Sequence, residues 1–108
     1  MSLYGRYIEE REGIKIIAHS DGFITYAINK KNCWIHDIFI VPKSRRYKLG
    51  SNLADQVVDI AKKEGCTMLG AQCVVNTKNI TDSVKALLGY GFEVVSANGG
   101  IITFAKEI

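Results

Sequence analysis

The strongest constraint on this chain is an abrupt change of hydrophobic period on either side of Pro42. Residues 33–41 (CWIHDIFIV) are almost continuously apolar, which is typical of a strand buried on both faces. Proline cannot donate to a strand ladder, so we expect this strand to end at Pro42. Beyond it, apolar residues recur at helical spacing, at Leu49, Leu53, Val57, Ile60 and Ala61. The pattern therefore predicts a central strand, a loop and an amphipathic helix.

A second apolar strand is predicted directly after this helix, over residues 66–75. Lys62, Lys63 and Gly65 precede it, and such residues are typical of a helix carboxyl end. A strand, a helix and a strand of this length imply two parallel strands joined by a right-handed crossover.

The remaining segments predict antiparallel hairpins around this crossover. A turn signal at residues 20–22 joins strands over residues 14–19 and 23–28, and residues 97–100 join strands over 92–96 and 101–106. A second helix covers residues 80–88, with Asn79 or Thr81 as its amino-terminal cap. The predicted order is βββαβαββ, an α/β fold with a mixed, mostly antiparallel sheet and one parallel β-α-β crossover. We expect one domain, preceded by a short segment over residues 1–12.

Composition excludes several classes of protein. The chain has 14 basic and 11 acidic residues, and a net charge of +3 is too mild for a dedicated nucleic-acid binder. No run approaches the roughly 18 apolar residues of a membrane-spanning helix, and the amino terminus lacks a secretory pattern. We therefore expect a cytoplasmic protein without membrane contact. Cys33, Cys66 and Cys73 show no metal-ligand spacing, so we expect reduced thiols and no metal.

The loop between the central strand and the long helix is a candidate anion site. The first turn of a helix has free N–H groups and the positive end of the macrodipole, which favour an anion. Gly50 allows close backbone approach, and four basic side chains cluster here, Lys43, Arg45, Arg46 and Lys48. The alternative is a solvated basic loop without a ligand.

The same segment resembles motif A of the GCN5-related N-acetyltransferase (GNAT) superfamily. That motif is an apolar strand and Val-x-Pro, then Arg/Gln-x-x-Gly-x-Gly/Ala opening a helix. This chain has Ile38-Phe39-Ile40-Val41-Pro42, then Arg45-Arg46-Tyr47-Lys48-Leu49-Gly50. Gly91-Phe92 is similar to the end of the family's second helix, and the resemblance covers residues 13–108 in the right order.

The resemblance implies an acetyl-CoA site and transfer of acetyl to an amine of unknown identity, within a ternary complex. The pantetheine arm would pair with the backbone near Ile40 and Val41, where two parallel strands splay apart. Asn79 would cap its helix or contact CoA. The pyrophosphate would be held by the loop and the first helical turn, at Arg45, Arg46, Tyr47, Lys48, Leu49, Gly50 and Ser51.

Three departures from the family pattern bear on activity. Lys48 stands at the first glycine of the motif, and its side chain either crowds the diphosphate or adds a contact. Leu87 stands where the family often has a tyrosine general acid, and nearby Tyr90 fits a packing role better. The short amino-terminal segment implies an acceptor side that is truncated, open or completed by a second subunit of a homodimer. The alternative function is a degenerate GNAT module that binds CoA or a protein without turnover.

Asp37 is the candidate general base. It precedes Ile38 on the central strand, where the family often places a carboxylate that faces the acceptor. Burial beside apolar neighbours would raise its pKa toward neutrality, as a base requires. The alternative is a carboxylate paired with a lysine or a backbone N–H. His36 would point to the opposite face of the strand.

Overall fold

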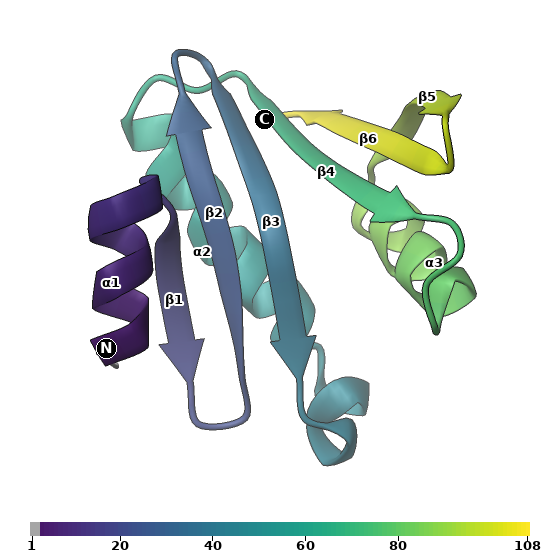
Figure 1. Ribbon diagram of the computed structural model, residues 1–108, viewed down its shortest axis with the longest axis horizontal. Helices are drawn as coiled ribbons and strands as arrows, with labels where there is room; N and C mark the ends of the chain where they lie inside the picture. The colour runs from purple at the N-terminus through teal and green to yellow at the C-terminus, as the bar shows by residue number, and fades with distance from the viewer. Residues whose placement is uncertain (1–2) are drawn as a thin grey trace.

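The computed structural model describes residues 3–108, without the side chains of residues 4, 5, 8, 9, 12, 46 and 47. Figure 1 shows the elements in chain order. They are α1 (Leu3–Glu12), β1 (Lys15–His19), β2 (Gly22–Asn29), β3 (Asn32–Ile40), the 3-10 helix η1 (Pro42–Tyr47), α2 (Leu49–Lys63), β4 (Met68–Val74), α3 (Ile80–Tyr90), β5 (Glu93–Asn98) and β6 (Ile101–Glu107).

The strands form one six-stranded sheet in the order β1-β2-β3-β4-β6-β5. Only β3 and β4 pair in parallel among the described strands, and α2 is the crossover between them. The other pairs are antiparallel. The predicted α/β class, with its mixed sheet and single crossover, is confirmed.

The helix α1 lies within the short segment over residues 1–12 and is missing from the predicted order of elements. Leu3–Glu12 forms a helix that contacts β1. Its sequence is polar on average and carries no strong apolar stripe, so periodicity alone did not indicate it. Most helical stability in proteins comes from packing rather than from propensity, and here the packing partner is supplied by the sheet.

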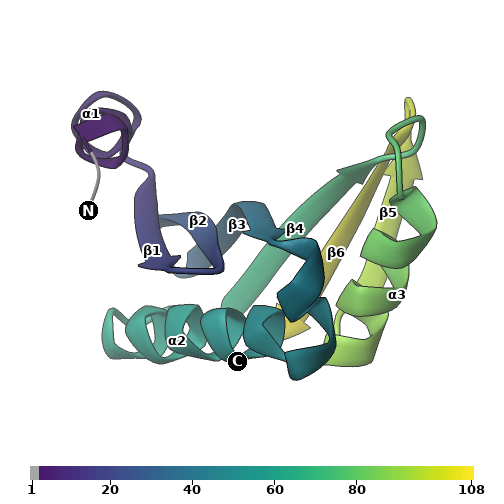
Figure 2. The same ribbon diagram turned by 90° about the horizontal axis from the view of Figure 1, so that it is seen from below.

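The two faces of the sheet differ in what covers them. Figure 2 shows α2 and α3 on one side, while α1 lies on the other side beside the β1 edge. The core lies between the sheet and α2 and α3, with Ile24, Leu53, Val57, Leu69 and Phe104 at most 1% exposed. We call this side the helix-covered face and the opposite side the open face. No helix among residues 3–108 is long and apolar enough to cross a membrane.

The central strand β3 is buried at one end only, which corrects the prediction of burial on both faces. Cys33 is fully buried, but residues 36–39 are exposed. The reason is that β3 loses its β4 neighbour beyond Ile35, and no described helix covers this part of the open face. The apolar run therefore marked a strand whose second half is exposed on both faces, at Ile38 and at Phe39, and this leaves apolar surface available to a ligand.

Candidate active site

The two central strands separate at the middle of the sheet. Parallel pairing runs only from Asn32–Met68 to Ile35–Ala71, yet β3 continues to Ile40 and β4 to Val74. Figure 1 shows the two strands diverging from this point. The backbone edge of β3 that faces β4 is thus left without a strand partner over residues 36–40. A splay of two parallel strands is the feature that the family resemblance implied here.

A β-bulge in β3 lies at the start of this splay. Thr25 faces Asp37 and Tyr26 faces Ile35, so His36 is the extra residue. The Asp37 N–H donates to Thr25 Oγ1 at 2.9 Å, across this bulge. Thr25 is 5% exposed, one of two buried polar residues among those described. Bulges re-aim backbone and side chains, and they are enriched next to active sites.

Asp37 lies on the open face and is exposed, which corrects the expected burial of its carboxyl group. Its pairing with Thr25 places it there, because the neighbours Ile24 and Tyr26 belong to the core on the other face. The backbone N–H of Asp37 donates to the threonine hydroxyl at 2.9 Å. The carboxylate therefore lies beside the splay and is accessible to a ligand, without the desolvation on which the base argument relied.

The loop after β3 is folded as η1, and α2 follows it through Lys48. Lys48 has φ 58°, a left-handed conformation that favours glycine. This explains why the motif has glycine at this position. The first hydrogen bond of α2 runs from Asn52 N–H to Lys48 O. The N–H groups of Leu49, Gly50 and Ser51 come before it in the chain, and such first-turn groups have no acceptor within their own helix. The side chains of Arg46 and Tyr47 lie outside the described part of the structure.

The loop is anchored to the end of β3 and to the β1–β2 turn. Val41 N–H donates to Asp21 O at 2.8 Å, and its carbonyl accepts from Ser44 N–H at 2.9 Å. Adjacent residues of a strand direct their backbone groups to opposite edges, so those of Ile40 point toward the gap beside β4. Arg45 Nε donates to Ile40 O at 2.9 Å on that edge. Of the two residues expected to pair with pantetheine, Ile40 faces the gap, with its carbonyl accepting from Arg45, whereas the backbone groups of Val41 are bonded to Asp21 and Ser44.

Gly50, on the first turn of α2, faces the end of β3. A Cβ atom there would lie 3.6 Å from Ile38 Cδ1 and 3.9 Å from Ile40 Cγ1, which are ordinary contacts. The fold itself therefore leaves room for a methyl group at this position. A requirement for glycine here would have to come from a ligand that approaches the backbone.

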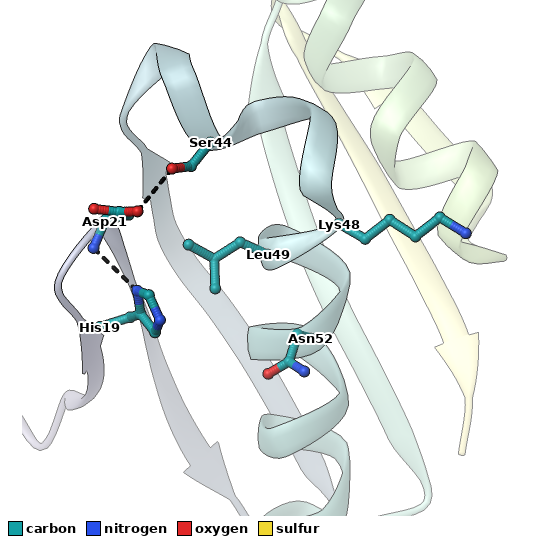
Figure 3. A pocket seen from close by; sticks show the side chains of 6 residues that line it. All are labelled: His19, Asp21, Ser44, Lys48, Leu49 and Asn52. Carbon is teal, nitrogen blue, oxygen red and sulfur yellow. Dashed lines mark hydrogen bonds between the residues drawn. The ribbon is translucent and has the colours of Figure 1, made fainter.

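A pocket of about 480 Å³ borders the amino end of α2 on the side of the β1–β2 turn. Its lining shares Lys48 and Leu49 with the predicted pyrophosphate site and adds His19, Asp21, Ser44 and Asn52. Figure 3 shows Ser44 Oγ bonded to Asp21 Oδ2, at 2.8 Å, and Asp21 N–H bonded to His19 Nδ1, at 3.0 Å. The Lys48 side chain extends away from Asp21 and His19. Its charge thus lies on the side of α2 away from the pocket's acidic residue.

The second helix, α3, places its three candidate residues in different settings. Asn79 is the N-cap residue, but it has φ 64° and makes no side-chain capping bond, which corrects its predicted capping role. Its exposed amide is thus available to a ligand. Leu87 packs against the core and brings no acid to the site. Tyr90 donates to Asp55 Oδ1 on α2 at 2.6 Å, and burial together with this bond raises the pKa of its phenol.

The described cysteines are free, with Cys33 and Cys66 buried and Cys73 half-buried. Burial raises the pKa of the Cys33 thiol from 9.0 to about 12, with smaller contributions from Cys66 and Glu64. A thiol this strongly protonated is a poor nucleophile. Among the described residues no group of histidine, cysteine and carboxylate side chains has metal-binding geometry.

Two residues of the site were not found from the sequence. Thr25 secures the bulge, and the signal that could have shown it was a polar residue within the apolar strand of residues 23–28. Ser44 is 8% exposed and holds the loop through Asp21. Nothing in the local pattern separates this serine from a solvated loop residue, because its partner lies 23 positions away.

Comparisons with known proteins agree with this geometry. The sequence model of the acetyltransferase (GNAT) family matches residues 4–83. A search among curated protein sequences finds no significant match. Among solved structures, a PaiA N-acetyltransferase from Thermoplasma acidophilum in complex with coenzyme A has a TM-score of 0.78 and 18% identity, over 94% of this chain and 66% of that chain.

Two further solved structures have the same fold. An acetyltransferase structure from Agrobacterium tumefaciens has a TM-score of 0.70 and 16% identity, over 95% of this chain and 84% of that one. Ard1 from Thermoplasma volcanium has a TM-score of 0.68 and 14% identity, over 82% of this chain and 63% of the Ard1 chain. The chain thus spans 66% of the PaiA chain and 63% of the Ard1 chain. With a family model that matches residues 4–83 and a splayed sheet of this topology, the chain belongs to the acetyltransferase (GNAT) family.

Proposed function

We propose that this protein transfers an acetyl group from acetyl-CoA to the nitrogen of an amine. The observation that carries the proposal is the splay of β3 from β4 next to the amino end of α2. An extended pantetheine arm fits the edge of β3 at Ile40, while the first-turn amides of α2, Leu49, Gly50 and Ser51, suit a pyrophosphate. The coenzyme A in the PaiA structure supports the use of an acyl-CoA.

The proposed reaction is direct transfer. The amine nitrogen forms a bond to the thioester carbonyl carbon, the carbon–sulfur bond breaks, and CoA leaves as its thiol. The surplus amine proton passes to a base. Catalysis of this kind depends mainly on placing the two reactants together, to which proton transfer adds typically 10²–10⁴-fold. Asp37, exposed on the open face beside the splay, is our proposed proton acceptor.

A second function, CoA binding without turnover, is favoured by one observation. The two residues nearest the family's usual acid are both engaged, because Leu87 packs against the core and the Tyr90 phenol is bonded to Asp55. In this reading nothing protonates the leaving thiolate except water. Release of free CoA in the presence of an amine is expected of the acetyltransferase and not of a module that only binds CoA.

Calorimetric titration with acetyl-CoA, with CoA and with ATP tests the cofactor. We expect micromolar binding that is selective for the CoA species. Equal affinity for ATP, or no binding at millimolar acetyl-CoA, would reject the proposal. Thiol release in the presence of an amine panel then separates enzyme from binding module.

The role of Asp37 is tested with Asp37→Asn. We expect acetyl-CoA affinity to stay unchanged and kcat to fall by about 10²-fold or more, because the variant cannot accept the proton. The matched control is Asp59→Asn on the exposed side of α2, which should retain both values. Full kcat in Asp37→Asn across the pH range would exclude Asp37 as the base.

A further inference from the structure

The open face carries apolar side chains on both sides of the splay. Strand pairing places Phe23 with Phe39 on one side and Val74 with Ile101 on the other. These four side chains are 37%, 45%, 47% and 39% exposed, respectively. Large apolar groups gathered on one uncovered face mark a binding surface more often than isolated ones do.

Three aromatic side chains of this face lie on β2 and β3. The Phe23 and Phe39 rings lie 6.1 Å apart between centroids. Trp34 lies on the same face, where its ring packs over Gly70, and a Cβ atom on that glycine would lie 2.6 Å from the ring. The absence of a side chain at Gly70 therefore lets the indole lie flat on the sheet. Aromatic surfaces of this kind accept both apolar groups and ammonium ions.

The charged side chains of the strands differ in sign between the two faces. Strand pairing assigns Asp37, Glu93 and Glu107 to the open face, with the bulge residue His36 left out of the alternation. The basic strand residues Lys15 and Lys106 pair with residues of the helix-covered face. A chain of net charge +3 thus presents acidic groups, and no lysine or arginine from its described strands, on this face.

From these observations we infer that the acceptor is a small primary monoamine with an aromatic body. Its ammonium group lies at Asp37 and its ring lies against Phe39 and Phe23. Asp37 and Phe39 are two residues apart on one face of β3, roughly 7 Å, which suits a short linker between amine and ring. A polycation such as spermidine would leave most of its charges over apolar side chains. This inference rests on the proposed function and names the substrate class of the same site.

The single tryptophan, Trp34, gives a readout that does not need turnover. The experiment titrates Trp34 fluorescence with 2-phenylethylamine, with the uncharged 2-phenylethanol and with spermidine. We expect saturable binding of 2-phenylethylamine that is at least tenfold tighter than that of either other compound. Spermidine binding as tight as 2-phenylethylamine binding, or no saturable response to 2-phenylethylamine, would overturn the assignment.

Variants locate the binding surface. Phe39→Ala should weaken the binding of 2-phenylethylamine about tenfold, because it removes apolar contact area at the ring of the ligand. Asp37→Asn should lower the affinity for 2-phenylethylamine and leave the affinity for 2-phenylethanol unchanged. The control is Val95→Ala on β5, where a 59% exposed side chain lies far from β3 in the strand order. If Phe39→Ala and Val95→Ala behave alike, the ring does not bind where we place it.

Acetyl-CoA calorimetry on the same protein keeps the two hypotheses apart. Selective CoA binding together with a preference for spermidine would overturn only the substrate class. Absence of CoA binding together with tight 2-phenylethylamine binding would reject the acetyltransferase proposal and keep the ligand assignment. Thiol release with 2-phenylethylamine as acceptor, lost in Phe39→Ala at subsaturating amine, would support both.

Discussion

At the scale of single residues, the loop after β3 shows why the family motif contains glycine. Lys48 has the left-handed backbone conformation that the chain needs between η1 and α2. A non-glycine residue in this conformation costs of order 1–2 kcal/mol. The Lys48 side chain extends away from the β1–β2 turn, so the substitution leaves the pocket beside that turn open. The replacement of glycine by lysine therefore bears on backbone strain and charge more than on the pocket's space.

Gly50 provides the sharpest residue-scale prediction. Gly50→Ala should leave the melting temperature unchanged or slightly higher, because a Cβ makes only ordinary contacts there and alanine favours a helix. If a phosphate of the cofactor approaches the backbone of Gly50, the variant should bind acetyl-CoA about tenfold more weakly. Calorimetry measures the affinity and a thermal melt measures the stability.

The matched control is Gly89→Ala in α3. A Cβ on Gly89 meets nothing within 4 Å, so this variant gains roughly 0.5–1 kcal/mol of helix stability without touching the loop. Its acetyl-CoA affinity should equal that of the parent protein. Equal affinities in both variants would argue against phosphate contact at Gly50.

At the scale of elements, the bulge in β3 links the sheet to the site. The Thr25 hydroxyl accepts a hydrogen bond from the Asp37 N–H across the bulge. The side chain that stabilises the irregular strand is therefore on β2, and the irregularity itself is on β3. The position of Asp37 depends on this interaction between two elements.

Thr25→Val tests that dependence. The variant keeps the shape of the side chain and loses the hydroxyl, which should cost about 1–2 kcal/mol and speed hydrogen exchange at the Asp37 amide. We expect kcat to fall several-fold with little change in acetyl-CoA affinity. Exchange is followed by NMR, and kcat by thiol release.

Thr103→Val on β6 is the control for Thr25→Val. The Thr103 hydroxyl accepts from the exposed Gln72 side chain and not from the backbone of an irregular strand. Exchange at Asp37 should remain slow in this variant. Unchanged exchange at Asp37 in Thr25→Val would mean that the bulge is held by something else.

At the scale of the whole molecule, stability should depend on pH above the neutral range. Burial raises the pKa of the Cys33 thiol from 9.0 to about 12, so the folded state favours the protonated thiol. The unfolded chain releases this proton near pH 9. The stabilisation from Cys33 is therefore complete below pH 9 and is lost as the pH rises toward 12.

Thermal melts between pH 7 and pH 11 measure this loss. Cys33→Ala should start from a lower melting temperature at pH 7, because a core side chain is shortened. Its melting temperature should then fall by several degrees less than that of the parent protein over the alkaline range. Cys73→Ala, at a half-buried position, should keep most of the parent's slope. Parallel curves for Cys33→Ala and the parent would contradict the assignment.

Local patterns were sufficient for most of the secondary structure. The change of period at Pro42 predicted β3 and α2, and turn residues predicted both hairpins. These signals are local because helices and turns depend on residues three or four positions apart. The family resemblance, which rests on the motif at residues 38–50 and on the order of elements over residues 13–108, then implied the splay of β3 from β4 that the structure confirms.

Features that depend on distant partners were not contained in those patterns. The exposure of Asp37, the bulge at His36 and the helix α1 follow from which strands pair and which face remains uncovered. Thr25 and Asp37 are 12 positions apart, and Tyr90 and Asp55 are 35 apart. An apolar segment has the same sequence pattern whether a helix covers it in the folded protein or it stays exposed to a ligand. Only the folded sheet, with helices on one face and none over β3 on the other, distinguishes a strand buried in the core from one whose apolar side chains remain exposed.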